Sequence, residues 1–426
     1  MVIRSTVRGW PTPTREAALK IELNLLYTLL VAMLVFFAGR FLVSRVSWLE
    51  RFSVPAPVVG GVLIAVTLAA AQGLAGVGVS FDMSLKDPLL LAFFTSVGLA
   101  ADARMLAKGG TRLFIFLAIC ALYIVVQNLI GLSVAWAMDL HPVVGLLGGS
   151  ITLTGGHGTG GAYATRFGET MNLQGAMELT MACATAGLVI GGVLGGPLAQ
   201  YLIRRHKLSG PAEGAGDDAS GPASAAAAEA GEPVDAITSG SFMAALFVIL
   251  FCLVGGQALA QLMQNTGFIL PDFLFCLLLG VLIRNVGPFI PGFRLSGASV
   301  DLLGGTALSL FLVMALMAMK LLDLANLAGP LLIVLALQAV AMVAYAAFVT
   351  FRVMGSNYDA AIMAAGHVGF GLSSTAAALA IMKAVTQRTG PSPLAFLIVP
   401  MVGAFFIDIL NALIVQAYLA IPWVGF

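Results

Sequence analysis

The chain has 426 residues, of which 60% are hydrophobic and only 10% are charged, and its net charge at pH 7 is +1. Soluble domains carry about 25% charged residues, so this composition excludes a soluble globular protein and indicates a chain that crosses the lipid bilayer many times. The near-neutral net charge gives no sign of a nucleic-acid partner.

Ten apolar runs are long enough to cross a bilayer, which takes about 20 helical residues. Residues 1–22 form a polar N-terminal tail ahead of them. The predicted spans are 23–43, 54–74, 88–107, 112–137, 175–203, 242–262, 269–287, 302–321, 329–353 and 392–419. Residues 206–240, rich in Gly, Ala, Ser and acidic side chains, predict a flexible linker. The predicted fold is an all-α polytopic membrane protein with five spans in each half, 23–205 and 241–420.

Basic residues gather in the loops on one side of these spans. This set comprises Arg40, Arg45, Arg51, Arg104, Lys108, Arg112, Arg204, Arg205, Lys207, Arg284, Arg294, Arg352, Lys383 and Arg388. Short loops rich in Lys and Arg face the cytoplasm. We therefore expect a cytoplasmic linker and, because five crossings reverse the direction of the chain, two periplasmic termini. The basic residues of the N-terminal tail depart from this rule.

Two further apolar stretches, 142–168 and 358–383, are interrupted by glycine-rich polar strings. Ser150 to Gly161 reads Ser-Ile-Thr-Leu-Thr-Gly-Gly-His-Gly-Thr-Gly-Gly, and Ala364 to Thr375 reads Ala-Ala-Gly-His-Val-Gly-Phe-Gly-Leu-Ser-Ser-Thr. Backbone without helical hydrogen bonds is tolerated at membrane depth only inside protein or beside a water-filled cavity. The two stretches therefore predict re-entrant hairpins, and their matching positions in the two halves favour a transporter's binding site.

The two halves share landmarks in the same order and at nearly constant spacing. The pairs are Pro55 with Pro271, Gly156-His157 with Gly366-His367, and Tyr201-Leu202 with Tyr418-Leu419. This pattern indicates a duplication, and an odd number of spans per copy makes the copies inverted. The first hairpin would then enter from outside and the second from the cytoplasm, so that their tips meet near the membrane midplane.

The glycine-rich strings supply the candidate substrate-binding residues. Glycines let backbone groups approach a ligand, the following half-helix offers a positive N-terminus, and hydroxyls add neutral donors. The candidates are Thr154, Gly155, Gly156, His157, Gly158, Thr159, Gly366, His367, Gly369, Phe370, Gly371, Ser373, Ser374 and Thr375. The alternative is close helix packing, because small residues are common where membrane helices meet. His157 and His367 could bind a carboxylate or shuttle protons, or simply satisfy hairpin carbonyls.

Asp408 is the only acidic residue deep within an apolar run, and Asn411 lies on the same face of the predicted helix, three residues later. An intramembrane carboxylate is a functional candidate by default. Together with Ser150, Thr152 and the unwound carbonyls, this pair suits a small cation, although a substrate ammonium or an internal partner remains possible. No paired nucleophile and base is recognisable, so the sequence predicts no enzyme, and no polar stripe predicts a channel.

Several long strings resemble bacterial sodium/glutamate symporters, relatives of the sodium-citrate transporters, over about residues 23–420. They run from Asp82 to Leu89, Gly149 to Gly160, Met181 to Thr185, Asn357 to Ala361, Ala365 to Leu372 and Leu397 to Asp408. The resemblance implies a Na⁺-driven L-glutamate importer of the bacterial inner membrane. It also implies a homodimer whose hairpin-bearing domain moves like an elevator, and it makes Na⁺ the expected cation. The alternative is a sodium-coupled carrier of another small dicarboxylate or amino acid.

Overall fold

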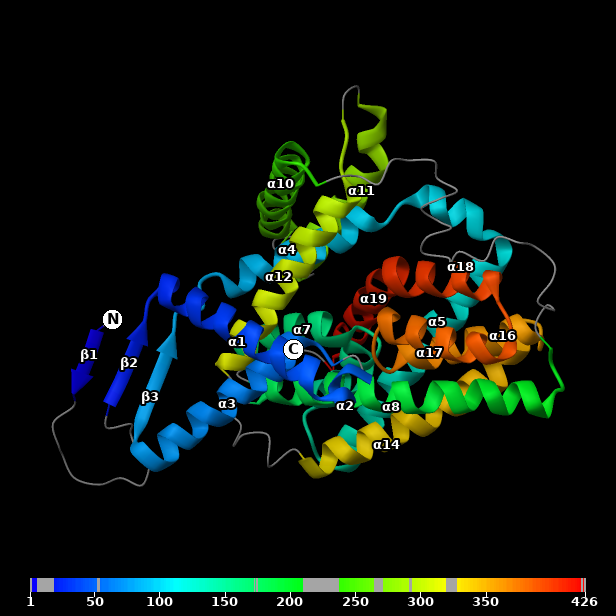
Figure 1. Ribbon diagram of the computed structural model, residues 1–426, viewed down its shortest axis with the longest axis horizontal. Helices are drawn as coiled ribbons and strands as arrows, with labels where there is room; N and C mark the ends of the chain where they lie inside the picture. The colour runs from blue at the N-terminus through cyan, green and yellow to red at the C-terminus, as the bar shows by residue number, and fades with distance from the viewer. Residues whose placement is uncertain are drawn as a thin grey trace.

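The computed structural model describes residues 2–5, 19–51, 54–171, 173, 175–209, 237–263, 271–290, 293–318, 328–422 and 424. Residues 210–236, most of the predicted linker, lie outside the described residues, as do residues 6–18 of the predicted tail. Helices dominate the fold, and a small sheet lies at the end of the molecule that holds the N-terminus (Figure 1).

The helices of the first half follow one another with short connections. They are α1 (Leu25–Arg45), α2 (Ser47–Arg51), α3 (Ala56–Ala75), α4 (Lys86–Ala100), α5 (Ala103–Ala137), α6 (Pro142–Leu146), the π-helix η1 (Leu147–Ile151), α7 (Gly156–Thr170) and α8 (Ala176–Arg205). Helix α5 contains a break at Gly110, whose φ of 58° is left-handed. The apolar, membrane-crossing part of α5 is Gly110–Ala137.

The second half presents a similar order of elements. It contains α10 (Ser239–Met263), α11 (Asp272–Val286), the 3-10 helix η3 (Gly287–Phe289), α12 (Gly297–Met317), α14 (Ala328–Tyr345), the π-helix η4 (Ala346–Thr350), α15 (Phe351–Val353), α16 (Tyr358–Gly371), α17 (Thr375–Thr389), α18 (Pro393–Met401), the π-helix η5 (Val402–Phe406) and α19 (Ile407–Leu419).

Within the described residues, eight helices are long and apolar enough to cross a membrane. The predicted spans 88–107 and 392–419 are the two that differ. Helix α4 has 15 residues, and at about 1.5 Å per residue it falls short of the roughly 30 Å hydrocarbon core. The stretch 392–419 is divided into α18 and α19 by η5, which begins after Met401, the residue that follows Pro400 at the end of α18. Proline removes a backbone donor, and π-helical turns are typical of such interruptions.

A three-stranded sheet is the departure from the predicted all-helical fold. Strands β1 (Val2–Ser5) and β2 (Leu19–Leu23) pair antiparallel, and β2 pairs parallel with β3 (Val77–Phe81). Leu19 lies opposite Val77 and Leu23 opposite Phe81. Part of the predicted tail is therefore attached to the chain between α3 and α4. Both β2 and β3 alternate apolar residues with polar or small ones, which is the period of a strand.

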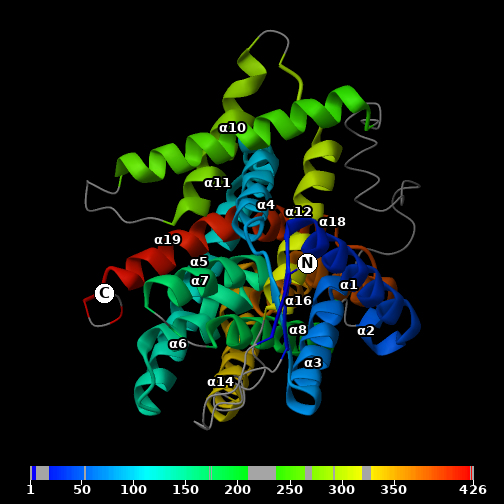
Figure 2. The same ribbon diagram turned by 90° about the vertical axis from the view of Figure 1, so that its left-hand side faces the viewer.

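Six helices, α1, α3, α4, α10, α11 and α12, pack against one another and form what we call the framework group. Their backbones approach closely at glycines. A Cβ placed on Gly60 of α3 would lie 2.1 Å from the carbonyl oxygen of Val35 in α1, and a Cβ on Gly98 of α4 would lie 2.1 Å from that of Leu277 in α11. Figure 2 shows α10 and α11 at one end of this group, with α4 and α12 beneath them.

The remaining long helices, α5, α8, α14 and α16 to α19, together with α6, η1 and α7, form the hairpin group. Its core contains fully buried side chains of α5, α16 and α18, among them Phe116, Ile124 and Ile398. Small residues again allow close contact, because a Cβ on Gly187 of α8 would lie 2.2 Å from the carbonyl oxygen of Leu372. Both interrupted stretches of the sequence belong to this group, so its packing positions the candidate site.

Candidate functional site

The first hairpin consists of α6, η1 and α7, and its backbone leaves the helical conformation at Gly149 (φ −98°, ψ −136°). Asn128 of α5 compensates for this break. Its Oδ1 accepts hydrogen bonds from the backbone nitrogen of Ser150 at 3.1 Å and from the Ser150 hydroxyl at 2.9 Å. The turn then places Gly156 at φ +67°, a left-handed conformation that glycine adopts without steric cost. Helix α7 begins at this residue.

The second hairpin consists of α16 and α17, joined by a turn at residues 372–374. Ser374 caps α17, because its hydroxyl accepts a hydrogen bond from the backbone nitrogen of Ala377 at 3.3 Å. The hydroxyl of the neighbouring Ser373 is buried and has no hydrogen-bond partner among the described residues. Ser373 is therefore the residue of this turn whose side chain is available to a ligand.

The tips of the two hairpins lie against each other. The hydroxyl of Thr154 lies 3.4 Å from the carbonyl oxygen of Gly371, and a Cβ on Gly156 would lie 3.2 Å from that of Ser373. Gln127 of α5 contacts both tips, accepting from the Thr154 hydroxyl at 2.5 Å and donating to the Gly371 carbonyl at 2.7 Å. Two half-helices, α7 and α17, thus begin on opposite sides of one buried polar junction.

Asp408 and Asn411 lie beside the first hairpin. Asp408 is in the first turn of α19, is partly exposed, and interacts with the hydroxyl of Thr159 in α7. Asn411 is fully buried and donates from Nδ2 to the carbonyl oxygen of Ser150 at 3.1 Å, whereas its Oδ1 has no partner among the described residues. The structure therefore brings three of the four predicted cation ligands, Asp408, Asn411 and Ser150, into one cluster with Thr159.

Thr152, the fourth predicted cation ligand, is engaged elsewhere. Its hydroxyl donates to the carbonyl oxygen of Leu147 at 2.7 Å, so it satisfies a carbonyl of the interrupted arm of its own hairpin. Its methyl group would lie 3.2 Å from a Cβ on Gly160. In the part of the chain that the structure describes, no group of three or more His, Cys, Asp or Glu side chains could hold a metal ion. A cation here would depend on neutral oxygens and one carboxylate.

His157 lies in the first turn of α7, next to the tip. Its Nε2 is 3.1 Å from the hydroxyl of Thr185, and that hydroxyl donates its hydrogen to the carbonyl oxygen of Met181 at 2.8 Å. Since a hydroxyl has one hydrogen, Thr185 accepts from Nε2 in this arrangement. Nε2 therefore carries a hydrogen, and Nδ1 is an acceptor when the ring is neutral.

His367 lies one turn before the end of α16 rather than at the tip where the sequence pattern placed it. Its ring is enclosed by the rings of Phe116, Tyr123 and Tyr345, and it stacks on Phe370 at 5.1 Å between centroids. Its Nδ1 is hydrogen-bonded to the hydroxyl of Thr350 at 2.8 Å. Both His367 and Phe370, two of the predicted substrate ligands, therefore belong to a buried aromatic cluster.

Most glycines of the two strings face other side chains. A Cβ on Gly158 would lie 2.6 Å from the ring of Phe93, and one on Gly161 would lie 2.6 Å from that of Phe311. These contacts join α7 to the framework helices α4 and α12. In the second hairpin, Gly366 faces Met382 and Val399, Gly369 faces Ala378, Gly371 faces Met342, and Thr375 lies beside Gly403. Packing accounts for these positions. Gly155 faces Thr159 and Asn411, and Gly156 faces the carbonyl oxygen of Ser373 at the other tip.

Gln127 and Asn128, which lie outside both glycine-rich strings, complete the junction. Both are fully buried in α5. They are amides in an otherwise apolar span, which is the signal that could have identified them as partners of unwound backbone. Gln338 of α14 contacts only the backbone here, donating from Nε2 to the carbonyl oxygen of Gln127 at 2.7 Å.

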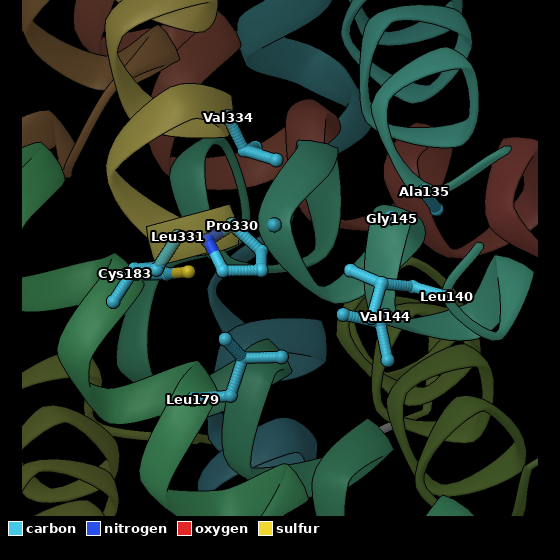
Figure 3. Close-up of a pocket in the computed structure, with 10 residues that line it drawn as sticks. Ala135, Leu140, Val144, Gly145, Leu179, Cys183, Pro330, Leu331 and Val334 are labelled. Carbon is cyan, nitrogen blue, oxygen red and sulfur yellow. The ribbon is translucent and has the colours of Figure 1, made fainter. Parts of the chain in front are cut away.

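Two recesses lie outside this junction. Figure 3 shows an apolar one beside the first arm of the first hairpin, with Val144 and Gly145 on one side and Pro330, Leu331 and Val334 of α14 on another. Its apolar walls offer no partner for an ion or a carboxylate. The second recess lies between α7 and α8 and the framework group, and charged residues contribute to its lining. These are Lys86, Glu169 and Glu178.

Long apolar helices around two discontinuous helical hairpins define a polytopic membrane protein with the architecture of secondary transporters. A comparison with protein families matches residues 21–391 to the Sodium/glutamate symporter family. The chain belongs to this family, which confirms the resemblance seen in the sequence.

Curated relatives extend this match over nearly the whole chain. The sodium/glutamate symporter of Escherichia coli K12 is 48% identical over 402 residues, which cover 94% of this chain and 98% of the relative. That of Haemophilus influenzae is 46% identical over 395 residues, covering 92% and 96%. These matches confirm a transporter and not an enzyme, and they support an integral, multi-pass protein of the inner membrane.

Proposed function

We propose that this chain couples inward Na⁺ movement to the uptake of L-glutamate across the bacterial inner membrane. The observation that carries the proposal is the junction of the two hairpin tips, where α7 and α17 begin beside a buried cluster of polar groups. Membership of the Sodium/glutamate symporter family supports Na⁺ and glutamate as the two transported species.

The substrate site is proposed at the two half-helix N-termini. Glutamate carries two carboxylates, and each N-terminus offers unsatisfied backbone N–H groups and positive dipole charge to one of them. Gly155, Gly156 and the neutral His157 would line one side, and Ser373, whose hydroxyl has no partner among the described residues, the other. The acceptor Nδ1 of His157 suits an ammonium group better than a carboxylate.

The Na⁺ site is proposed at the cluster of Asp408, Asn411, Thr159 and the Ser150 backbone. Carboxylate, amide and hydroxyl oxygens are the ligands that hard cations prefer. The buried Oδ1 of Asn411 has no partner among the described residues, and bound Na⁺ would satisfy it. Because Ser150 and Thr154 belong to the same hairpin, ion and substrate would stabilise one arrangement of it, and such mutual stabilisation is reciprocal.

We further propose that the two halves are inverted repeats and that the hairpin group moves against the framework group. The similar order of elements in the two halves supports the first idea. The contact of Phe93 and Phe311 with the glycine face of α7 supports the second, since smooth rings on small residues can slide without separating interlocked side chains. A homodimer held by framework helices is the expected assembly.

Ligand-dependent thermal stabilisation of the purified protein tests the proposed function. L-glutamate should raise the melting temperature in Na⁺ and have little effect in K⁺, because ligands that bind only the native state stabilise it. In proteoliposomes, uptake should saturate and require an inward Na⁺ gradient. Stabilisation by other amino acids or dicarboxylates but not by glutamate would favour the alternative, a sodium-coupled carrier of a different substrate.

The ends of the two halves are predicted to lie on opposite sides of the membrane. Cysteine introduced at Ser209, after α8, should react only with a membrane-impermeant reagent applied to the cytoplasmic side. Cysteine introduced at Ala420, after α19, should react only from the periplasmic side. The four native cysteines are buried and should give little background. Labelling of both positions from the same side would rule out inverted repeats with an odd number of crossings each. Gly425, another suitable periplasmic position, lies outside the described residues.

Gly161→Leu is predicted to impair movement more than binding. The new side chain must displace the fully buried ring of Phe311, and overpacking of this kind costs about 1–3 kcal/mol. We expect glutamate uptake to fall by roughly tenfold or more, while glutamate binding in Na⁺ changes by less than about threefold. Gly168→Leu, on the same helix with nothing within 4 Å of its Cβ, is the control. Equal losses of uptake and binding in Gly161→Leu would contradict sliding at this face.

A further inference from the structure

We propose that Gln127 is a positioning residue that holds both hairpin tips in one arrangement and thereby couples Na⁺ binding to glutamate binding. This inference rests on the proposed function and adds a residue outside the proposed ligands. Gln127 lies in the middle of α5, and its side chain is fully buried.

The amide of Gln127 joins two elements that are far apart in the sequence. Its Oε1 accepts from the hydroxyl of Thr154 in the first hairpin at 2.5 Å, and its Nε2 donates to the carbonyl oxygen of Gly371 in the second at 2.7 Å. The amide group is planar, with acceptor and donor on opposite sides. Both hydrogen bonds therefore form together only when the two tips lie at one separation and the amide has one orientation.

One contact satisfies a backbone carbonyl at a helix end, and the other satisfies a buried side-chain hydroxyl. Gly371 is the last residue of α16, and the last carbonyl groups of a helix have no partner within it. Thr154 lies at the end of the interrupted arm, directly before Gly155 and Gly156. An unpaired buried polar group is costly, so these hydrogen bonds favour the arrangement in which the two tips meet.

The backbone of Gln127, rather than its side-chain amide, is contacted from the second half of the chain. Gln338 of α14 donates to its backbone carbonyl at 2.7 Å, and the hydroxyl of Tyr123 lies 3.4 Å from the carbonyl oxygen of Gln338. Its neighbour Asn128 holds Ser150, whose carbonyl accepts from Asn411 in the proposed Na⁺ cluster. One turn of α5 thus contacts the proposed ion site through Asn128 and the proposed substrate site through Gln127.

The linkage between the two ligands provides the test. The dissociation constant of L-glutamate is measured by calorimetry on purified wild-type protein and on Gln127→Met, at low and at saturating Na⁺. The ratio of the two constants is the coupling factor, which is commonly about 5 to 150. We expect Gln127→Met to lower this factor by roughly tenfold, because the apolar side chain fills the space but joins neither tip. A uniform loss of affinity would change both constants equally and leave the factor unchanged.

Two further variants separate coupling from stability. Gln338 is as deeply buried as Gln127, and its hydrogen bond to the Gln127 carbonyl is 2.7 Å long, the same as that from Gln127 to Gly371. Gln338→Met removes this hydrogen bond, but the carbonyl that accepts it is backbone and stays in place within α5. This variant should keep the coupling factor within about twofold of wild type. Gln127→Asn keeps a buried amide, which protects folding, but it is one methylene too short to reach both tips, so it should also lose coupling.

A wild-type coupling factor in Gln127→Met or Gln127→Asn would overturn the inference, and so would an equal loss in Gln338→Met. If the dissociation constant of L-glutamate for the wild-type protein did not depend on Na⁺, the proposed function would be contradicted, and Gln127 would have no coupling to provide. The wild-type titration thus distinguishes the two failures before any variant is compared.

Discussion

Replacing Asp408 with asparagine is expected to raise the Na⁺ concentration needed for half-maximal glutamate binding by roughly 10- to 100-fold. The substitution keeps the shape of the side chain and removes its charge. Interactions of charged groups contribute about 1.5–3 kcal/mol, and each 1.4 kcal/mol corresponds to about tenfold in affinity. Glutamate at saturating Na⁺ should still bind, because the proposed substrate ligands at the hairpin tips are unchanged.

The position of Asp408 favours the ion over the substrate ammonium. Its carboxylate interacts with Thr159, and Asn411, one turn along α19, adds a buried oxygen with no partner among the described residues. The measurement is a Na⁺ titration of glutamate binding followed by a glutamate titration at saturating Na⁺. A larger change in the glutamate curve than in the Na⁺ curve would assign Asp408 to the ammonium, and two unchanged curves would make it structural.

Asp301→Asn is the matched control for this prediction. Asp301 is an exposed aspartate on α12 of the framework group, so its substitution removes one negative charge from the protein without touching the proposed ion site. We expect both titration curves to stay within about twofold of wild type. Any general effect of net charge on Na⁺ accumulation would appear in this variant and can be subtracted from that of Asp408→Asn.

Gly369→Ala is expected to reduce glutamate binding and uptake by roughly 10- to 100-fold while leaving the protein folded in the membrane. The new Cβ would lie 2.5 Å from the Cα of Ala378 and 2.8 Å from its nitrogen. These are backbone atoms of α17, so no side-chain rotation relieves the contact, and the two arms of the second hairpin must separate. Overpacking costs about 1–3 kcal/mol. Here it would displace the turn between α16 and α17, which carries Ser373.

Two comparisons identify the cause of that loss. Gly196→Ala, in α8 with nothing within 4 Å of its Cβ, should leave both activities near wild type. Gly156→Ala should lose activity through its left-handed backbone, which costs a non-glycine residue about 1–2 kcal/mol. Gly156→Asn should therefore recover part of it, because asparagine tolerates this conformation. Near-normal uptake by Gly369→Ala would remove the second hairpin from the mechanism.

The sequence by itself determined that this chain is a helical membrane protein of the sodium/glutamate symporter family. Burial in lipid requires long apolar runs, and these are visible without any knowledge of contacts. The glycine-rich strings are equally visible, because interrupted backbone at membrane depth needs residues of a special kind. Asp408 and Asn411 could be paired from the sequence since both lie on one helix, where spacing alone fixes the face.

Only the tertiary structure decided which of the marked residues meet. In the sequence, a glycine that contacts a ligand cannot be told from a glycine that contacts a phenylalanine ring. Gly158 and Gly161 contact Phe93 and Phe311, which lie far from them in the sequence. His367 belongs to the same glycine-rich string as the tip of the second hairpin, but its ring packs among rings from α5 and α14. Gln127 could not be assigned because the two residues that its amide contacts, Thr154 and Gly371, lie 217 residues apart in the sequence. Hydrogen bonds between distant segments follow from how helices pack, and local sequence carries no record of that packing.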